Sequence, residues 1–66
     1  MHLTINGQSK NIDGASTIAE LVGRFCPNSK AIITEINGTI VPSTDWQKTS
    51  LKDGDTVELV AFVGGG

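Results

Sequence analysis

Residues 17–25 read TIAELVGRF, and they predict the one helix of the chain. Thr17 and Glu20 have the spacing of a capping box, in which the hydroxyl accepts a backbone N–H at the helix start and the carboxylate accepts one in return. Pro27 disfavours helical geometry at Cys26, so the helix should end there. A helix of about nine residues is unstable alone in water, so this one must pack against a sheet. The side that packs should be the apolar stripe formed by Ile18, Leu21, Val22 and Phe25.

Strands are expected on both sides of this helix. Asn6-Gly7 and Asn37-Gly38 favour tight type I′ turns, because such a turn needs a positive φ at both central residues. Asp53-Gly54-Asp55 predicts a third turn. Residues 43–50 have no clear period and predict irregular structure or one helical turn. The expected strands cover residues 2–5, 8–12, 31–36, 39–41 and 56–63.

The order of these elements is β-β-α-β-β-β, which predicts an α+β fold of the β-grasp type. The opening hairpin gives antiparallel pairing, and the helical crossover favours a parallel return. We therefore expect a mixed sheet of four to five strands with one helix packed on one face. Residues 1–63 would form this domain, and residues 64–66 a flexible glycine arm.

Length and charge exclude several classes of protein. A chain of 66 residues buries only about 60% of the surface that it exposes when unfolded, which favours a binding or carrier module over an enzyme with an internal cleft. The net charge of −2 argues against nucleic acid, whose phosphates need a basic surface. No apolar run approaches the roughly 20 residues of a membrane span. Residues 1–4 lack the pattern of a signal peptide, and a single cysteine suits the reducing cytoplasm.

Groups that could perform chemistry are few. His2 and Cys26 belong to different elements, so a nucleophilic pair is not expected. Asp53 and Asp55 are interpreted as turn residues, because no metal-ligand spacing surrounds them. Trp46 is either a binding anchor or a residue that closes the end of the core, and the second interpretation is favoured. No cofactor is expected.

The three terminal glycines are the unusual feature of the chain. One interpretation of Gly64, Gly65 and Gly66 is a frayed tail or a cloning remnant. The other is an arm of roughly 10 Å that carries the terminal carboxylate. Because glycine has no Cβ, such an arm could enter a channel too narrow for other residues. Its carboxylate would there be a substrate and not a catalyst.

Several ordered motifs along the whole chain resemble those of the ubiquitin-like sulfur carriers, the ThiS/MoaD-like family, and most closely its carriers of thiamine biosynthesis. The resemblance rests on Ile36-Asn37-Gly38, Ile40-Val41-Pro42, Trp46, residues 51–58 and the ending Phe62-Val63-Gly64-Gly65-Gly66. Ser43 departs from the pattern, because the family often has a basic residue after the proline.

This resemblance implies a cycle of sulfur transfer. An E1-like adenylating enzyme of the ThiF type would adenylate the carboxylate of Gly66, with Gly64 and Gly65 as the tether. Sulfur from a persulfide donor would displace AMP and give a thiocarboxylate. Thiazole synthase would then receive the sulfur for the thiazole ring of thiamine. Two alternatives stay open: the small subunit of molybdopterin synthase, and a non-covalent ubiquitin-like interaction module.

The last expected strand predicts where a partner binds. Val57, Leu59, Ala61 and Val63 share one face, and Glu58, Val60 and Phe62 share the other. One helix can cover only one face, so Val60 and Phe62 should lie open beside the glycine arm, joined by Ile33 and Glu35. Exposed apolar residues in so small a domain often mark a binding surface. The alternative is that a loop covers them.

Overall fold

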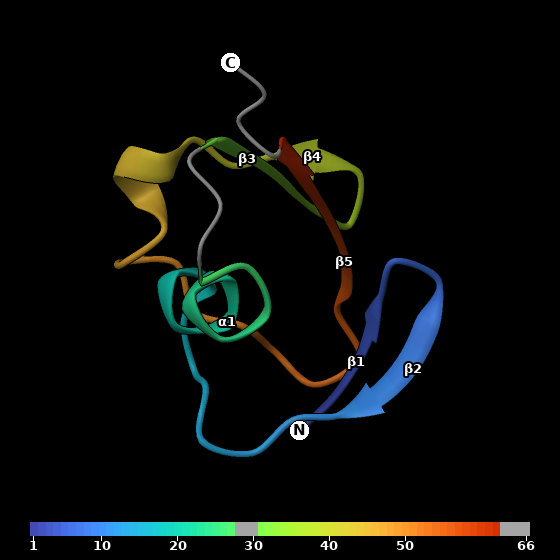
Figure 1. Ribbon diagram of the computed structural model, residues 1–66. Helices are drawn as coiled ribbons and strands as arrows, with labels where there is room; N and C mark the ends of the chain where they lie inside the picture. The colour runs from blue at the N-terminus through green and yellow to red at the C-terminus, as the bar shows by residue number, and fades with distance from the viewer. Residues whose placement is uncertain (28–30, 63–66) are drawn as a thin grey trace.

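The computed structural model describes residues 1–27 and 31–62, and it has one α-helix against a five-stranded mixed sheet (Figure 1). The sheet order is β2-β1-β5-β3-β4. The first and last strands, β1 and β5, pair in parallel, and the other neighbours are antiparallel. This is the α+β arrangement that the element order predicts. The elements are β1 (His2–Ile5), β2 (Gln8–Asn11), α1 (Ile18–Phe25), β3 (Ala31–Ile36), β4 (Thr39–Ile40), the 3₁₀ helix η1 (Ser43–Asp45) and β5 (Thr56–Phe62).

Both Asn-Gly pairs form the tight turns expected of them. The φ angles are 50° and 80° at Asn6 and Gly7, and 51° and 85° at Asn37 and Gly38. Two strands are one residue shorter than predicted. β2 ends at Asn11 because Ile12 turns into the core, and β4 ends at Ile40, two residues before Pro42.

The N-terminus of α1 is held by a long loop as well as by its own capping box. Thr17 caps the helix, and Glu20 closes the box. The N–H groups of Ile18 and Ala19 donate to the carbonyl oxygens of Thr49 and Trp46, at 3.1 and 3.2 Å. The N–H groups that a helix start leaves unpaired are thus satisfied by a segment about thirty residues further along the chain.

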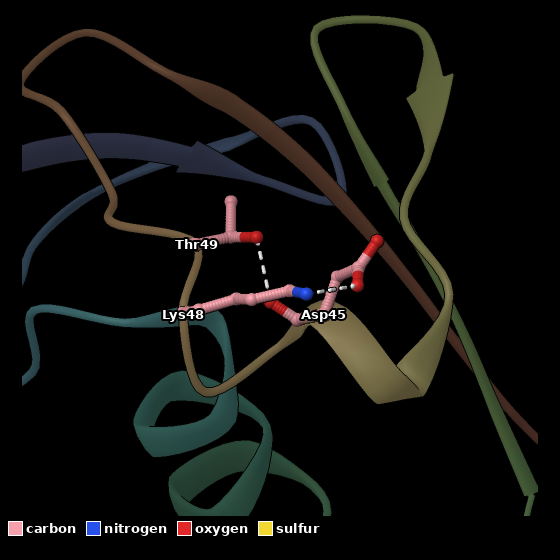
Figure 2. Close-up of polar contacts among 3 residues, drawn as sticks. All are labelled: Asp45, Lys48 and Thr49. Atoms are coloured by element: carbon pink, nitrogen blue, oxygen red, sulfur yellow. Dashed lines mark hydrogen bonds and ion pairs between the residues drawn. The ribbon is translucent and has the colours of Figure 1, made fainter.

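That loop is stiffened by a few contacts of its own, shown in Figure 2. Its first part is η1, which agrees with the second of the two structures expected for residues 43–50, irregular structure or one helical turn. The Thr49 hydroxyl donates to the carbonyl oxygen of Asp45 at 2.6 Å, and Lys48 Nζ lies 3.2 Å from Asp45 Oδ1. These contacts help to hold the Thr49 carbonyl where the helix needs an acceptor.

The core lies between α1 and the half of the sheet nearest to it. An eight-residue helix is about 12 Å long, whereas seven strand residues span about 23 Å, so α1 cannot follow β5 to its end. Ala61 points to the same side as Val57 and Leu59 but is exposed, and Phe25 at the helix end remains 38% exposed. The buried apolar residues are Leu3, Ile5, Ile12, Ala15, Ile18, Leu21, Val22, Leu51, Val57 and Leu59.

One buried polar atom has no partner among the described residues. Thr34, in the middle of β3, is completely buried, and its hydroxyl makes no hydrogen bond. A buried hydroxyl without a partner lowers stability, because it has lost its hydrogen bonds to water.

Replacing Thr34 with valine should therefore stabilise the domain. Thr34→Val keeps the shape of the side chain and removes the unpaired hydroxyl, so the free energy of unfolding should rise by about 1 kcal/mol in urea denaturation. Thr34→Ser is the matched control: it keeps the hydroxyl, loses a methyl group and should lower the free energy of unfolding by about 0.8 kcal/mol. A valine variant less stable than wild type would contradict this account.

The capping carboxylate is the one titratable group in the described chain with a clear pKa shift. Hydrogen bonds from the backbone and then the hydroxyl of Ser16, with further bonds from Thr17, hold the pKa of Glu20 below its ordinary value of 4.5. The Glu20 Oε1 atom accepts all four of these bonds, at 2.9–3.2 Å. Because these donors favour the ionised form, the folded state is stabilised while Glu20 is charged.

Acid should remove this stabilisation over a defined interval. A lowered folded-state pKa gives stability that is fully present above 4.5 and is lost as the pH falls through the lower folded value. Glu20→Gln keeps an acceptor oxygen without the charge, so its thermal midpoint should lie below that of wild type at pH 7. The two midpoints should converge as the pH approaches 3. A difference that stays constant between pH 7 and pH 3 would show that the charge has no such role.

Candidate functional site

The face of the sheet that α1 leaves uncovered is here called the open face (Figure 1). Opposite residues in an antiparallel pair point to the same side. Ile33 lies opposite Val60, and Glu35 lies opposite Glu58. These residues alternate with the buried Val57, Leu59 and Thr34, so the open face is the one predicted from the alternation of β5.

Four large apolar side chains on the open face form what we call the apolar patch. It consists of Ile33, Ile40, Val60 and Phe62, which are 44, 63, 49 and 51% exposed. No loop in the described part of the chain buries these residues. Exposed apolar groups gathered in this way often mark a binding site on a small domain.

The strand pattern of the sequence predicted Ile33, Glu35, Val60 and Phe62 on this face, but not Ile40. A signal for Ile40 was nevertheless present. A two-residue turn at Asn37-Gly38 fixes the register of the hairpin, so that Ile36 faces Thr39 and Glu35 faces Ile40. Ile40 therefore had to share the face of Glu35.

The β1–β2 end of the open face is polar. His2 and Thr4 lie opposite Asn11 and Ser9, and His2 Nε2 lies 2.6 Å from the Ser9 hydroxyl. Cys26 is a free, half-buried cysteine that packs against the core on the helix side. The structure therefore does not bring His2 and Cys26 together, in agreement with the expectation that they form no nucleophilic pair.

The carboxylates of the third turn serve the fold. Asp53 Oδ1 accepts the backbone N–H of His2 at 2.6 Å. Asp55 accepts from the Asn37 side chain at 3.0 Å and from the Lys52 backbone at 2.8 Å. Within residues 1–27 and 31–62, no three His, Cys, Asp or Glu side chains are grouped to hold a metal ion.

Trp46 is a structural residue. Its indole N–H donates to the carbonyl oxygen of Val41 at 2.9 Å, and its ring is half-buried against the core. The interpretation that Trp46 closes the end of the core agrees with this position.

The α1 helix is too short to cross a membrane, and the described residues contain no other α-helix.

The glycine arm lies outside the described residues. The description of β5 ends at Phe62, four residues before Gly66. The assignments of Gly64 and Gly65 as a tether and of Gly66 as the reacting residue therefore stay predictions from the sequence.

Comparisons with known proteins agree on one family. The model of the ThiS family matches residues 3–66. The sulfur carrier protein ThiS of Bacillus subtilis is 34% identical, over 97% of this chain and 98% of its own length. A crystal structure of the thiamine biosynthesis protein ThiS from Geobacter metallireducens covers both chains completely, with 35% identity and a TM-score of 0.81.

A longer relative matches as well. A thiazole synthase of Paramagnetospirillum magneticum is 38% identical over all 66 residues, and the chain spans 20% of the length of that protein. These matches favour the thiamine branch over the molybdopterin alternative. The chain belongs to the ThiS family, the sulfur carriers of thiamine biosynthesis, and is not itself a catalyst.

Proposed function

We propose that the carboxylate of Gly66 is the group that carries the sulfur. An E1-like enzyme of the ThiF type first joins this carboxylate to AMP, because a free carboxylate is a poor electrophile. The terminal sulfur of a persulfide then displaces AMP. Cleavage of the resulting sulfur–sulfur bond by a thiol leaves the thiocarboxylate, which thiazole synthase consumes.

The observation that carries this proposal is the extent of the family match. The match runs to residue 66 and so includes the three glycines. Glycine is a common residue, but three glycines in a row directly after an apolar strand are unusual. Glycine accepts conformations that other residues avoid and brings no side chain, which suits passage through a narrow channel. Four residues after Phe62 can span at most about 14 Å, so a partner that holds the apolar patch can also reach Gly66.

The proposal that thiazole synthase receives the sulfur is supported by the longer relative. In the Paramagnetospirillum protein, a segment similar to this whole chain is part of a thiazole synthase. A carrier joined to its acceptor has a high effective concentration at the acceptor site. The separate chain would have to gain the same proximity by binding.

The single cysteine of the sequence supports the reducing cytoplasm as the place of this cycle.

We further propose that the adenylating enzyme binds the open face through Ile33, Glu35, Val60 and Phe62. The three apolar side chains are exposed and contiguous, since Ile33 is opposite Val60 and Phe62 is two residues further along β5. Covering them would remove apolar surface from water close to the arm.

Deleting Gly66 should prevent sulfur loading. The new terminal carboxylate would stop about 3.5 Å short of its target, which is far more than the roughly 1 Å error that can lower a rate a hundredfold. The measurement is the mass of the intact protein after incubation with adenylating enzyme, ATP and a sulfur source. Wild type should gain one oxygen-to-sulfur exchange at its C-terminus.

Two further variants accompany that test. Gly65→Leu should also fail to load, because its side chain would block the channel. Cys26→Ser should load like wild type, since the proposed sulfur site is the terminal carboxylate. Loading of the Gly66 deletion at the wild-type rate, or an added mass that maps to an internal residue, would contradict the carrier mechanism.

Phe62→Ala should weaken binding to the adenylating enzyme by about tenfold while the fold stays intact. The chain offers a matched control in Phe25→Ala. Phe25 is also a partly exposed phenylalanine, but it lies at the end of α1, away from the open face. Isothermal titration calorimetry of both variants measures the effect of position alone. Equal affinities for wild type and Phe62→Ala would exclude the open face as the binding surface.

A further inference from the structure

Two glutamates face each other on the open face, beside the apolar patch. Glu35 on β3 lies directly opposite Glu58 on β5, with Ile33–Val60 as the next pair on that face. Directly opposite residues have Cβ atoms about 4.5–5.5 Å apart, and two like charges at this separation destabilise a sheet. The second cross-strand neighbour of Glu35 is the exposed Ile40.

No basic residue in the described part of the chain forms an ion pair with Glu35 or Glu58. Lys10 lies opposite Leu3 and so points to the other side of the sheet, and Arg24 donates to the carbonyl oxygen of Asp13 at 2.6 Å. Lys48 pairs with Asp45. In the described part of the chain, no hydrogen bond and no ion pair reaches the carboxylate of Glu35 or Glu58.

The placement of this pair contrasts with that of three other carboxylates, which serve the fold. Glu20, Asp53 and Asp55 each accept hydrogen bonds that support a helix start or a turn. Glu35 and Glu58 support nothing within the described domain, and like charges placed directly opposite each other weaken a strand pairing. The fold alone therefore gives no reason for two acids at this position.

We propose that the Glu35–Glu58 pair receives a basic side chain of thiazole synthase, an arginine or lysine at the border of an interface whose centre is the apolar patch. This inference rests on the proposed function, because it takes thiazole synthase as the partner. Arginine suits two neighbouring carboxylates particularly well, since its planar group can donate to both. Binding then replaces a repulsion with two attractions, and the apolar contacts around the charges keep water out.

The charge also gives the interface its selectivity. A partner with an apolar surface but no cation would have to bury two facing carboxylates without compensation, which is strongly unfavourable. A correctly placed cation turns the same pair into an attraction. The apolar patch alone would bind many apolar surfaces, so the acidic pair restricts which of them can dock.

The test measures the affinity of the intact chain for the thiazole synthase of the same organism. Glu58→Gln and Glu35→Gln should each bind about tenfold more weakly than wild type, and the affinity of wild type should fall as salt is raised. Asp13→Asn is the matched control. It also removes one negative charge, but from an exposed loop outside the sheet, so its affinity should equal that of wild type.

A stability measurement separates docking from folding. Glu58→Lys replaces the repulsion with an attraction to Glu35, so the thermal midpoint of the free domain should rise by roughly 1–8 °C. The same variant should bind thiazole synthase more weakly than Glu58→Gln, since it presents a cation to a cation. A domain that becomes more stable while its docking fails would be the signature of this proposal.

The outcomes that overturn the inference differ from those that overturn the carrier function. Unchanged affinity of Glu58→Gln and Glu35→Gln for thiazole synthase, with normal sulfur transfer from wild type, refutes the inference alone. A loss confined to the adenylating enzyme also refutes it, because the cation would then belong to that enzyme. Failure of wild type to form a thiocarboxylate refutes the carrier function, whatever the glutamate variants do.

Discussion

The structure depends on a mismatch of length between its one helix and its sheet. The eight residues of α1 reach along only about half of β5, and they cover only one face. Val57 and Leu59 therefore lie in a core, while Ala61 on the same side is exposed. Residues 1–27 and 31–62 contain no second α-helix that could cover the open face. The open face is thus a consequence of how little of the sheet one short helix can cover.

The central strand connects this core to the end of the chain. β5 pairs with β1 over only two residue pairs, because β1 turns away at Asn6. The side chain of Asn6 then replaces the missing strand: its amide oxygen accepts the N–H of Leu59 at 2.8 Å, and its amide nitrogen donates to the carbonyl oxygen of Leu59 at 3.2 Å. The same residue adopts a φ of 50° to make the tight turn. One asparagine thereby ends the first hairpin and supports β5 beyond the reach of β1, where only β3 accompanies it toward Phe62.

Local signals predicted most of this fold, and long-range contacts account for what they missed. The Asn-Gly turns, the capping box and the alternation of β5 depend on residues close in sequence, and each has the predicted form in the structure. The support of the helix start by Thr49 and Trp46 depends on contacts across about thirty residues, and no local pattern reveals it. The facing glutamates were missed for a similar reason. The alternation of residues along β5 predicts which face Glu58 occupies. Only the register of β3 against β5 shows that Glu35 lies directly opposite Glu58.

In the proposed cycle the carrier binds two enzymes in turn and leaves both, which limits how strongly its surface can attract either. One terminal carboxylate serves both steps of the proposed cycle, so both enzymes must approach the same end of the sheet. A patch of four apolar residues provides a modest driving force, in the range of small and transient interfaces. A larger apolar face would bind more tightly and slow the exchange, because affinity is set mainly by the rate of dissociation. Facing charges at the edge of such a patch add selectivity without adding apolar area, and this combination suits a protein that must be released after each transfer.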